Sequence, residues 1–157
     1  MSEHLQREVE RLNERFPPEA HSALIPALRL AQEEHGWLPP AALREVAEAV
    51  GVTPAACQAV ASFYDMFHLE PVGRHLIEVC TNLSCALSGA QRVVEAFELE
   101  LGIPAGATSD DGAVTLRLVE CLGGCGYATV VAVDGRYRHN VAPGDAAAIV
   151  KELDDHA

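Results

Sequence analysis

The sequence has no long apolar segment and few basic side chains. No run of about 18 apolar residues occurs in its 157 residues, so we expect no helix that crosses a bilayer. The first residues, Met1 to His4, are polar and partly acidic, and they lack the apolar core of a signal peptide. Lys and Arg number 11 against 23 Asp and Glu, which gives a formal net charge of −12. Nucleic acids and anionic membranes attract basic patches, so we expect neither as a partner, and we expect a cytoplasmic protein without direct membrane insertion.

Sequence signatures of nucleotide binding and of hydrolysis are also missing. Gly123 and Gly126 do not complete a G-x-G-x-x-G pattern, and the sequence contains no phosphate loop. No catalytic triad and no pair of carboxylates with a definable task can be recognised. We therefore expect no nucleotide-binding site within the chain itself.

The first part of the chain has the pattern of a small helical bundle. Apolar residues recur there at helical spacing in four stretches, and Pro or Gly residues bound each stretch. The stretches are Glu8, Val9, Leu12 and Phe16 before Pro17-Pro18; Ala23, Leu24, Ala27, Leu28 and Ala31 before Gly36; Ala41–Val50 before Gly51; and Pro54 to about Phe63, with Thr53 as the N-cap. Residues 1–72 show no strand pattern, so we predict a helical N-terminal segment over this range.

Residues 73–157 alternate between strand and helix patterns instead. The expected elements are a strand at His75–Cys80, a helix from Cys85 to Leu101, strands at Ala113–Glu120 and Ala128–Val133, a strand at Arg136–Val141 after the Asp134-Gly135 turn, and a helix at Ala146–Leu153. In the second strand, Val114, Leu116 and Leu118 are expected on one face and Thr115 and Arg117 on the other. The order β-α-β-β-β-α fits a thioredoxin-like layer. The predicted fold is therefore α+β, a helical bundle followed by a thioredoxin-like α/β domain.

Four of the five cysteines form two close pairs. Cys80 and Cys85 have the spacing C-x4-C, and after 35 intervening residues Cys121 and Cys125 have the spacing C-x3-C. Cys57 stands apart within a helical pattern, so we interpret it as a buried structural thiol. A disulfide framework is not expected in a chain without a secretion signal. The paired spacing points to metal or redox chemistry.

The spacing favours a cluster of two irons over other uses of the four thiols. Thiolates from two loops can hold two irons bridged by two sulfides, and such an oxidised cluster carries a net charge of about −2. Gly123, Gly124 and Gly126 allow backbone N–H groups to approach the sulfurs, and Cys85 is expected near a helix N-terminus. Structural zinc sites usually show C-x2-C pairs, and dithiol oxidoreductases favour C-x-x-C at a helix start. Spacing alone leaves both alternatives open.

Two cysteine motifs resemble those of a known family. The segments Cys80–Cys85 (CTNLSC) and Glu120–Cys125 (ECLGGC) resemble the thioredoxin-like [2Fe–2S] ferredoxin family, and within it the E subunits of respiratory complex I. The segments His35–Leu38 (HGWL) and Ala61–Tyr64 (ASFY) are similar to the N-terminal helical region of those subunits. The resemblance covers nearly the whole chain. It implies that one [2Fe–2S] cluster is bound by four metal ligands, Cys80, Cys85, Cys121 and Cys125.

The resemblance also implies a function. It identifies the chain as an electron-transfer subunit of NADH:quinone oxidoreductase, beside the FMN- and NADH-binding subunit and other peripheral-arm subunits, and peripheral to the inner membrane. The chain itself would bind neither NADH nor FMN. A related alternative is the equivalent subunit of an NAD-linked formate dehydrogenase or bidirectional hydrogenase. An alternative from another class is a zinc-stabilised interaction module without redox function.

Two further expectations concern the residue after the last cysteine loop and the role of the helical N-terminal segment. Many members of the family have Ala-Pro after the last cysteine loop, where this chain has Ala128-Thr129. Thr129 adds a backbone N–H, so we expect a more regular adjoining strand and an altered loop geometry. We also expect residues 1–72 to help dock the flavoprotein partner, with the aromatic residues of Phe63–Phe67 as contact candidates.

Overall fold

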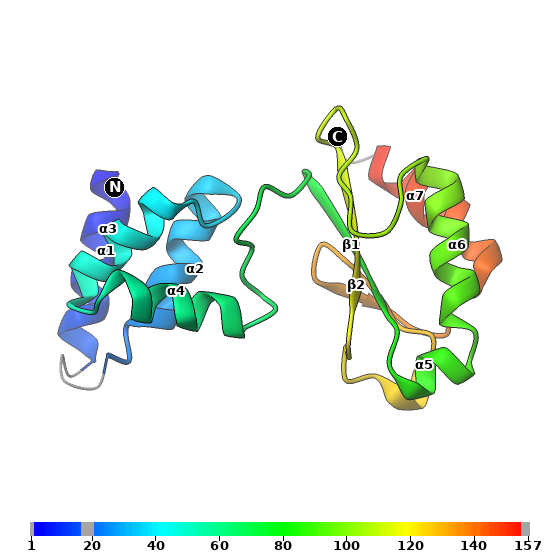
Figure 1. Cartoon of the computed structure of the whole chain (residues 1–157), viewed down its shortest axis with the longest axis horizontal. Coiled ribbons are helices and arrows are strands. Elements are labelled where there is room, and N and C mark those ends of the chain that lie inside the picture. Colours follow the sequence, from blue (N-terminus) through cyan, green and yellow to red (C-terminus); the bar gives the residue numbers. More distant parts are fainter. Residues whose placement is uncertain (1, 17–20, 155–157) are drawn as a thin grey trace. The chain divides into compact units, whose positions relative to one another are not determined.

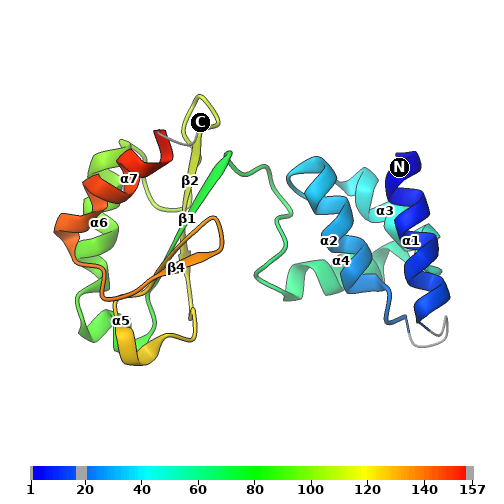
Figure 2. The same cartoon turned by 180° about the vertical axis from the view of Figure 1, so that it is seen from behind.

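The computed structural model of the chain describes residues 2–16 and 21–154. The chain divides into two compact units, Met1–Pro71 and Val72–Ala157. Figures 1 and 2 show the first unit as helices only and the second as a sheet with helices. The expected stop at Pro17-Pro18 lies outside the described residues.

The first unit contains the four expected helices, which are α1 (Glu3–Arg15), α2 (Leu24–His35), α3 (Pro40–Val50) and α4 (Pro54–Phe63). Their ends follow the sequence signals. The Thr53 side chain accepts a hydrogen bond from the Ala56 N–H at the start of α4, and Gly36 and Gly51 end α2 and α3 with φ of 77° and 78°. The helix predictions for this part of the chain are confirmed.

The core of the first unit collects the apolar stripes of all four helices. Leu5, Val9, Leu28, Val46 and Cys57 are almost completely buried in it. The segment after α4 returns to α2 through the amide of Gln32, which donates to the Met66 carbonyl at 2.9 Å and accepts from the His68 N–H at 2.7 Å. These two hydrogen bonds fix the segment on either side of Phe67. The Phe67 side chain is buried in the core, whereas Phe63 and Met66 are exposed.

Helices α3 and α4 also bear on the membrane expectation. Among the described residues, no single helix is long and apolar enough to cross a membrane, and α3 with α4 meets the length and composition only as a pair bent by 114°.

The second unit is built on a mixed four-stranded sheet. Its strands are β1 (His75–Cys80), β2 (Val114–Val119), β3 (Val131–Val133) and β4 (Arg136–Arg138), in the order β2-β1-β3-β4. β1 is parallel to β2 and antiparallel to β3, and β3 and β4 form the expected hairpin at Asp134-Gly135. Helices α6 (Ala90–Leu101) and α7 (Ala146–Asp154) lie on the same face of the sheet (Figures 1 and 2). The α+β fold class is confirmed.

The sheet and these two helices share one apolar core. Ile77 and Val79 of β1 pack there with Phe97 of α6 and Ile149 of α7. Because side chains alternate along a strand, those of Glu78 and Cys80 point away from this layer. The alternation therefore leaves Cys80 at the end of β1 free for another role.

The helix expected from Cys85 to Leu101 is two helices, and that prediction is wrong. A short helix, α5 (Leu83–Leu87), begins after Asn82, and α6 begins only at Ala90. Gly89 separates them with a φ of 94°, a left-handed value that interrupts a right-handed helix. The apolar pattern continues across this break, so periodicity alone did not locate it.

Two strand bounds also need correction. The strand expected at Arg136–Val141 ends at Arg138. In β2, Leu116 is buried and Leu118 is 46% exposed, because Leu118 lies near the end of an edge strand. Thr115 on the opposite face is buried, and its hydroxyl oxygen accepts from the Gly73 N–H at 2.7 Å. The strand expected from Ala128 begins only at Val131, so Thr129 does not extend it. The Ala128–Thr129 peptide bond is cis.

Candidate functional site

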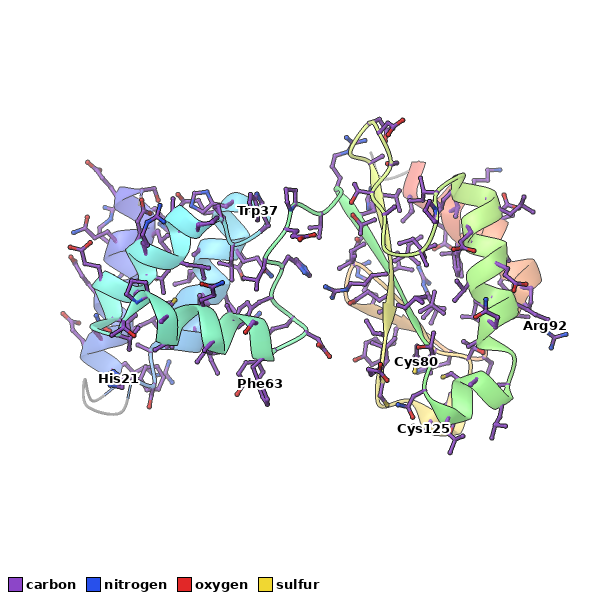
Figure 3. The ribbon with its side chains drawn as sticks, viewed as in Figure 1. His21, Trp37, Phe63, Cys80, Arg92 and Cys125 are labelled. Carbon is purple, nitrogen blue, oxygen red and sulfur yellow. The ribbon has the colours of Figure 1, made fainter. Side chains whose placement is uncertain are left out.

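The two cysteine pairs meet at one end of the sheet. Cys80 is the last residue of β1, and its register partner Val119 is the last residue of β2, so the two parallel strands deliver their following loops to the same edge. Cys85 lies in α5, which follows β1, and Cys125 opens the short 3-10 helix Cys125–Tyr127, which follows β2. Figure 3 shows Cys80 and Cys125 at this shared end of the unit. The topology therefore converts two distant sequence motifs into one site.

The four sulfurs interact with one another in a closed set. The Cys121 and Cys125 sulfurs are 4.0 Å apart. The Cys80 thiol interacts with those of Cys85 and Cys121, and Cys85 also interacts electrostatically with Cys125. All four thiols are free, with none in a disulfide. The structure thus brings together every cysteine that the sequence selects and leaves Cys57 in the helical core.

Burial differs between the two pairs. Cys80 and Cys85 are 3% and 2% exposed and pack with Ala90 and Val130 in a small apolar cluster. Cys121 and Cys125 are exposed. One side of the site is therefore shielded from water while the other faces it.

Backbone N–H groups surround the sulfurs. The Gly123 N–H donates to the Cys121 sulfur at 3.3 Å, the N–H groups of Asn82 and Leu122 interact with Cys80, and the Val130 N–H interacts with Cys85. These donors favour thiolates over thiols. The Gly123 donor was expected from the sequence, and Asn82 is an N-cap residue type. The donors of Leu122 and Val130 come from the main chain of apolar residues and carried no sequence signal.

The two buried cysteines have pKa values shifted in opposite directions. Burial works to raise the pKa of Cys80, but the hydrogen bonds from Asn82 and Leu122, with those of the neighbouring thiols, outweigh it and hold the pKa below its usual value. Burial raises the pKa of Cys85, and the charge of Cys80 adds to this effect. Within the pair, the hydrogen-bond donors therefore favour the thiolate at Cys80, and burial favours the thiol at Cys85.

The three glycines of the second loop have different roles. Gly123 donates to sulfur, as the sequence predicted, and has a φ of 75°. At Gly124 an added Cβ would lie 2.8 Å from the Cγ2 of Val130, so this glycine permits close packing. At Gly126 an added Cβ would meet no atom within 4 Å, so no close contact requires a glycine there.

The chemistry of this donor set fits a two-iron cluster. A [2Fe–2S] cluster takes four thiolates, and hydrogen bonds to its sulfurs and its exposure adjust its potential. Here four free thiols approach one another in pairs and N–H groups point at sulfur.

Comparisons with known proteins identify relatives. A family model described as thioredoxin-like [2Fe-2S] ferredoxin matches residues 9–154. The chain is 43% identical over 137 residues to the E 2 subunit of NADH-quinone oxidoreductase from Rhizobium meliloti (strain 1021), with 87% of this chain and 81% of that protein covered. It is 41% identical over 136 residues to the E subunit of NADH-quinone oxidoreductase from Mycobacterium tuberculosis (strain ATCC 25618 / H37Rv), of which it spans about half, 54%, while 87% of this chain is covered.

A solved structure supports the fold. The chain matches an NAD+-reducing [NiFe]-hydrogenase in the air-oxidised state with a TM-score of 0.70, over 82% of this chain and 23% of that chain. The identity is 20%, so this likeness concerns the fold alone.

Proposed function

Because the chain belongs to the thioredoxin-like [2Fe–2S] ferredoxin family, we propose that it is an electron-transfer subunit of an NADH:quinone oxidoreductase, with its cluster held by Cys80, Cys85, Cys121 and Cys125. The proposal is supported above all by one observation: four free thiols meet at one end of the sheet, with N–H donors around them. The identity above 40% to two E subunits favours this complex over a hydrogenase or a formate dehydrogenase.

The residues of the site suit one-electron transfer. When bound, a [2Fe–2S] cluster accepts and returns one electron at a time. Cys80 and Cys85, with Ala90 and Val130, keep water from one side. The exposed pair Cys121 and Cys125 leaves the other side open to a redox partner. A flavin converts the two electrons of a hydride into single electrons, so a flavin-bearing subunit that oxidises NADH is the proposed neighbour.

Metal and sulfide analysis tests the cofactor directly. The full chain is purified anaerobically, and its iron, acid-labile sulfide and zinc are measured. We expect two irons and two sulfides per chain, and an EPR signal from one unpaired electron after reduction. One zinc per chain with no sulfide, from cells grown with sufficient iron, would instead establish the zinc-stabilised interaction module.

We propose that the two units have different functions. Residues 1–72 are the docking segment for the partner subunit, and residues 73–157 are the cluster-bearing domain. Around the end of α4, Phe63 is 78% exposed and Met66 is 47% exposed, and Tyr64 lies edge-on to Phe63 with ring centroids 5.1 Å apart. Figure 3 shows Phe63 projecting from the end of α4. Exposed apolar side chains of this size are typical of a surface that a partner covers.

A pull-down with the flavin-bearing subunit that is proposed as the partner tests the docking role. Phe63→Ser combined with Met66→Ser is expected to weaken retention of the partner at least tenfold, because both side chains leave water on docking. The control is Leu99→Ser on α6, outside this surface, which alters an apolar side chain that is more exposed than either, at 82%. Equal retention by the double variant and the wild type would remove the docking role.

The complex also sets the location that we propose. As a subunit of a quinone-reducing complex, the chain would lie at the cytoplasmic face of the inner membrane, held there by other peripheral-arm subunits. Purification of the complex from membranes, with identification of the subunits that accompany the chain, separates this parent complex from a hydrogenase or a formate dehydrogenase.

A further inference from the structure

One buried hydroxyl next to the cysteines has no hydrogen-bond partner within the protein. Thr129 is 2% exposed, and its Oγ1 forms no hydrogen bond. Across the described residues, the other buried side-chain atom in this condition is the Nε of Arg138, a residue that pairs with Glu152 through a different nitrogen at 2.6 Å. An unsatisfied buried hydroxyl destabilises the folded state, so native proteins rarely retain one without a reason.

The contrast with other threonines makes Thr129 unusual. The buried Thr115 hydroxyl contacts the Gly73 N–H and shares a hydrogen bond of 2.7 Å with Thr108. Thr81, which follows Cys80 directly, donates its hydroxyl to the Val119 carbonyl at 3.3 Å. The chain therefore satisfies the hydroxyl of a threonine beside the first cysteine but not that of Thr129.

The main chain places Thr129 at the cysteine site. Its two neighbours, Ala128 and Val130, both pack in the apolar cluster that contains Cys80 and Cys85. The Val130 N–H interacts with the Cys85 sulfur. Only four covalent bonds separate that nitrogen from the Thr129 Oγ1, so the two atoms lie within about 5 Å of each other. The Thr129 carbonyl accepts from the Val141 N–H at 2.9 Å, which fixes the backbone at this point.

We propose that the Thr129 hydroxyl donates a hydrogen bond to a sulfur of the bound [2Fe–2S] cluster, either a thiolate or a sulfide, and thereby raises the reduction potential of the cluster. This inference rests on the proposed function, since it requires the cluster. Anionic sulfur is an acceptor that the protein alone does not offer to this hydroxyl, and hydrogen bonds to a charged group are stronger than neutral ones. Reduction adds a negative charge to the cluster, so a donor at sulfur stabilises the reduced form more than the oxidised form.

A redox titration of the full chain, followed by EPR, tests the proposal. The variants Thr129→Val and Thr129→Ala both remove the hydroxyl, one at constant bulk and one with less bulk, and Thr129→Ser retains it. The matched control is Thr81→Val, in which the Val119 carbonyl keeps the hydrogen bond that it receives from the Thr81 N–H at 3.0 Å. Iron and sulfide are measured on every sample first, so a wild-type chain without a cluster would refute the proposed function before the titration begins.

We expect the Val and Ala variants to have lower midpoint potentials. At the wild-type midpoint their ratio of reduced to oxidised cluster should fall about threefold to tenfold, where tenfold corresponds to 59 mV for a one-electron couple. Thr129→Ser and Thr81→Val should match the wild type. Electron–nuclear double resonance in H2O and D2O should show one coupled exchangeable proton fewer in Thr129→Val.

Each other outcome also decides the matter. Potentials of Thr129→Val and Thr129→Ala equal to the wild-type value would overturn the proposal, as would an equal shift in Thr81→Val. If both hydroxyl-free variants lost the cluster while Thr129→Ser retained it, the hydroxyl would be required at the cluster, which supports the proposal. Loss of the cluster in Thr129→Ser as well would assign Thr129 to packing and refute it.

Discussion

Each sulfur of the site has a polar hydrogen or another thiol beside it, whereas the Cys57 sulfur lies among apolar side chains of the helical core. This difference in surroundings separates ligands from packing residues. Each of Cys80→Ser, Cys85→Ser, Cys121→Ser and Cys125→Ser is therefore expected to lose most of the iron, because serine is a poor ligand for iron in such clusters. Iron and sulfide analysis and the visible absorption measure the loss.

Cys57→Ala is the control for these four variants. It should keep the full complement of iron and sulfide, since Cys57 belongs to the first unit and contributes only to its core. Full loss of the cluster in Cys57→Ala, together with full retention in one of the four serine variants, would contradict the ligand assignment.

The same burial gives Cys57 a distinct pH dependence. Burial raises the pKa of the Cys57 thiol to about 11. Between about pH 9 and 11 the unfolded chain loses this proton while the folded chain keeps it, so the thiol contributes stability below pH 9 that is lost as the pH rises through 11. Each pH unit of difference corresponds to about 1.4 kcal/mol, so the wild type should lose about 2 kcal/mol relative to Cys57→Ala between pH 8 and pH 10.5.

Trp37 makes this measurement specific to the first unit. It is the one tryptophan in the chain, so its fluorescence during denaturant unfolding reports the unit that contains Cys57. The Ala variant corrects for every other effect of pH on stability, because the two proteins differ only at residue 57. A difference between the two proteins that stays constant from pH 8 to pH 10.5 would show that the thiol is not shielded.

Gly124 and Gly126 form a second residue-scale comparison. In Gly124→Ala the new methyl group would lie 2.8 Å from Val130, which is itself packed against the cysteines, whereas in Gly126→Ala it would meet nothing within 4 Å. Overpacking of this kind typically costs about 1–3 kcal/mol. We expect Gly124→Ala to lower the thermal unfolding temperature and the cluster content, with Gly126→Ala close to the wild type. Equal behaviour of the two variants would refute the packing role of Gly124.

At the scale of elements, the break between α5 and α6 is the feature that periodicity missed. The break at Gly89 ends the short helix that carries Cys85 and starts the long helix that covers the sheet. It requires a left-handed residue, and the added Cβ of Gly89→Ala would also lie 2.9 Å from a guanidinium nitrogen of Arg92. Arg92 has a flexible side chain that can move away, so the backbone conformation is the larger obstacle.

Gly89→Ala is expected to destabilise the second unit by about 1 kcal/mol, because a left-handed conformation costs an L-residue about that much. Thermal unfolding followed by circular dichroism measures the effect. The double variant Gly89→Ala with Arg92→Ala should be no more stable than Gly89→Ala alone. Recovery of wild-type stability in the double variant would show that the contact with Arg92, and not the backbone, is responsible.

At the scale of the whole molecule, charge and the source of electrons govern reduction. The net charge of −12 and the anionic cluster both oppose the addition of an electron, which favours a low potential. NADH delivers two electrons as a hydride, and the sequence carries no recognisable nucleotide-binding motif. The isolated chain is therefore expected to resist reduction by excess NADH and to be reduced by dithionite, as followed by visible absorption.

A control with the partner completes this experiment. Addition of the flavoprotein subunit should restore reduction by NADH. Prompt bleaching of the isolated chain by NADH alone would mean that this chain has nucleotide chemistry of its own, and the interpretation as an electron-transfer subunit would have to be abandoned.

The sequence by itself determined the local features of this protein. The caps at Thr53 and Gly51, the Asp134-Gly135 hairpin and the order of strands and helices were all predictable, because capping, turn chemistry and periodicity depend on neighbours along the chain. The two cysteine pairs were recognisable for the same reason. The prediction failed at Gly89, where the apolar pattern continues but the helix does not, and at the bounds of the last two strands.

Only the tertiary structure decided what surrounds the sulfurs. The parallel pairing of β1 with β2 brings Cys80 and Cys121 together across 40 residues of sequence, and it also sets which pair is buried. Only this convergence places three groups beside the sulfurs: the N–H groups of Leu122 and Val130 and the unpartnered hydroxyl of Thr129. Main-chain donors are common to nearly all residue types, so their direction follows from the fold and cannot be read from side-chain identity.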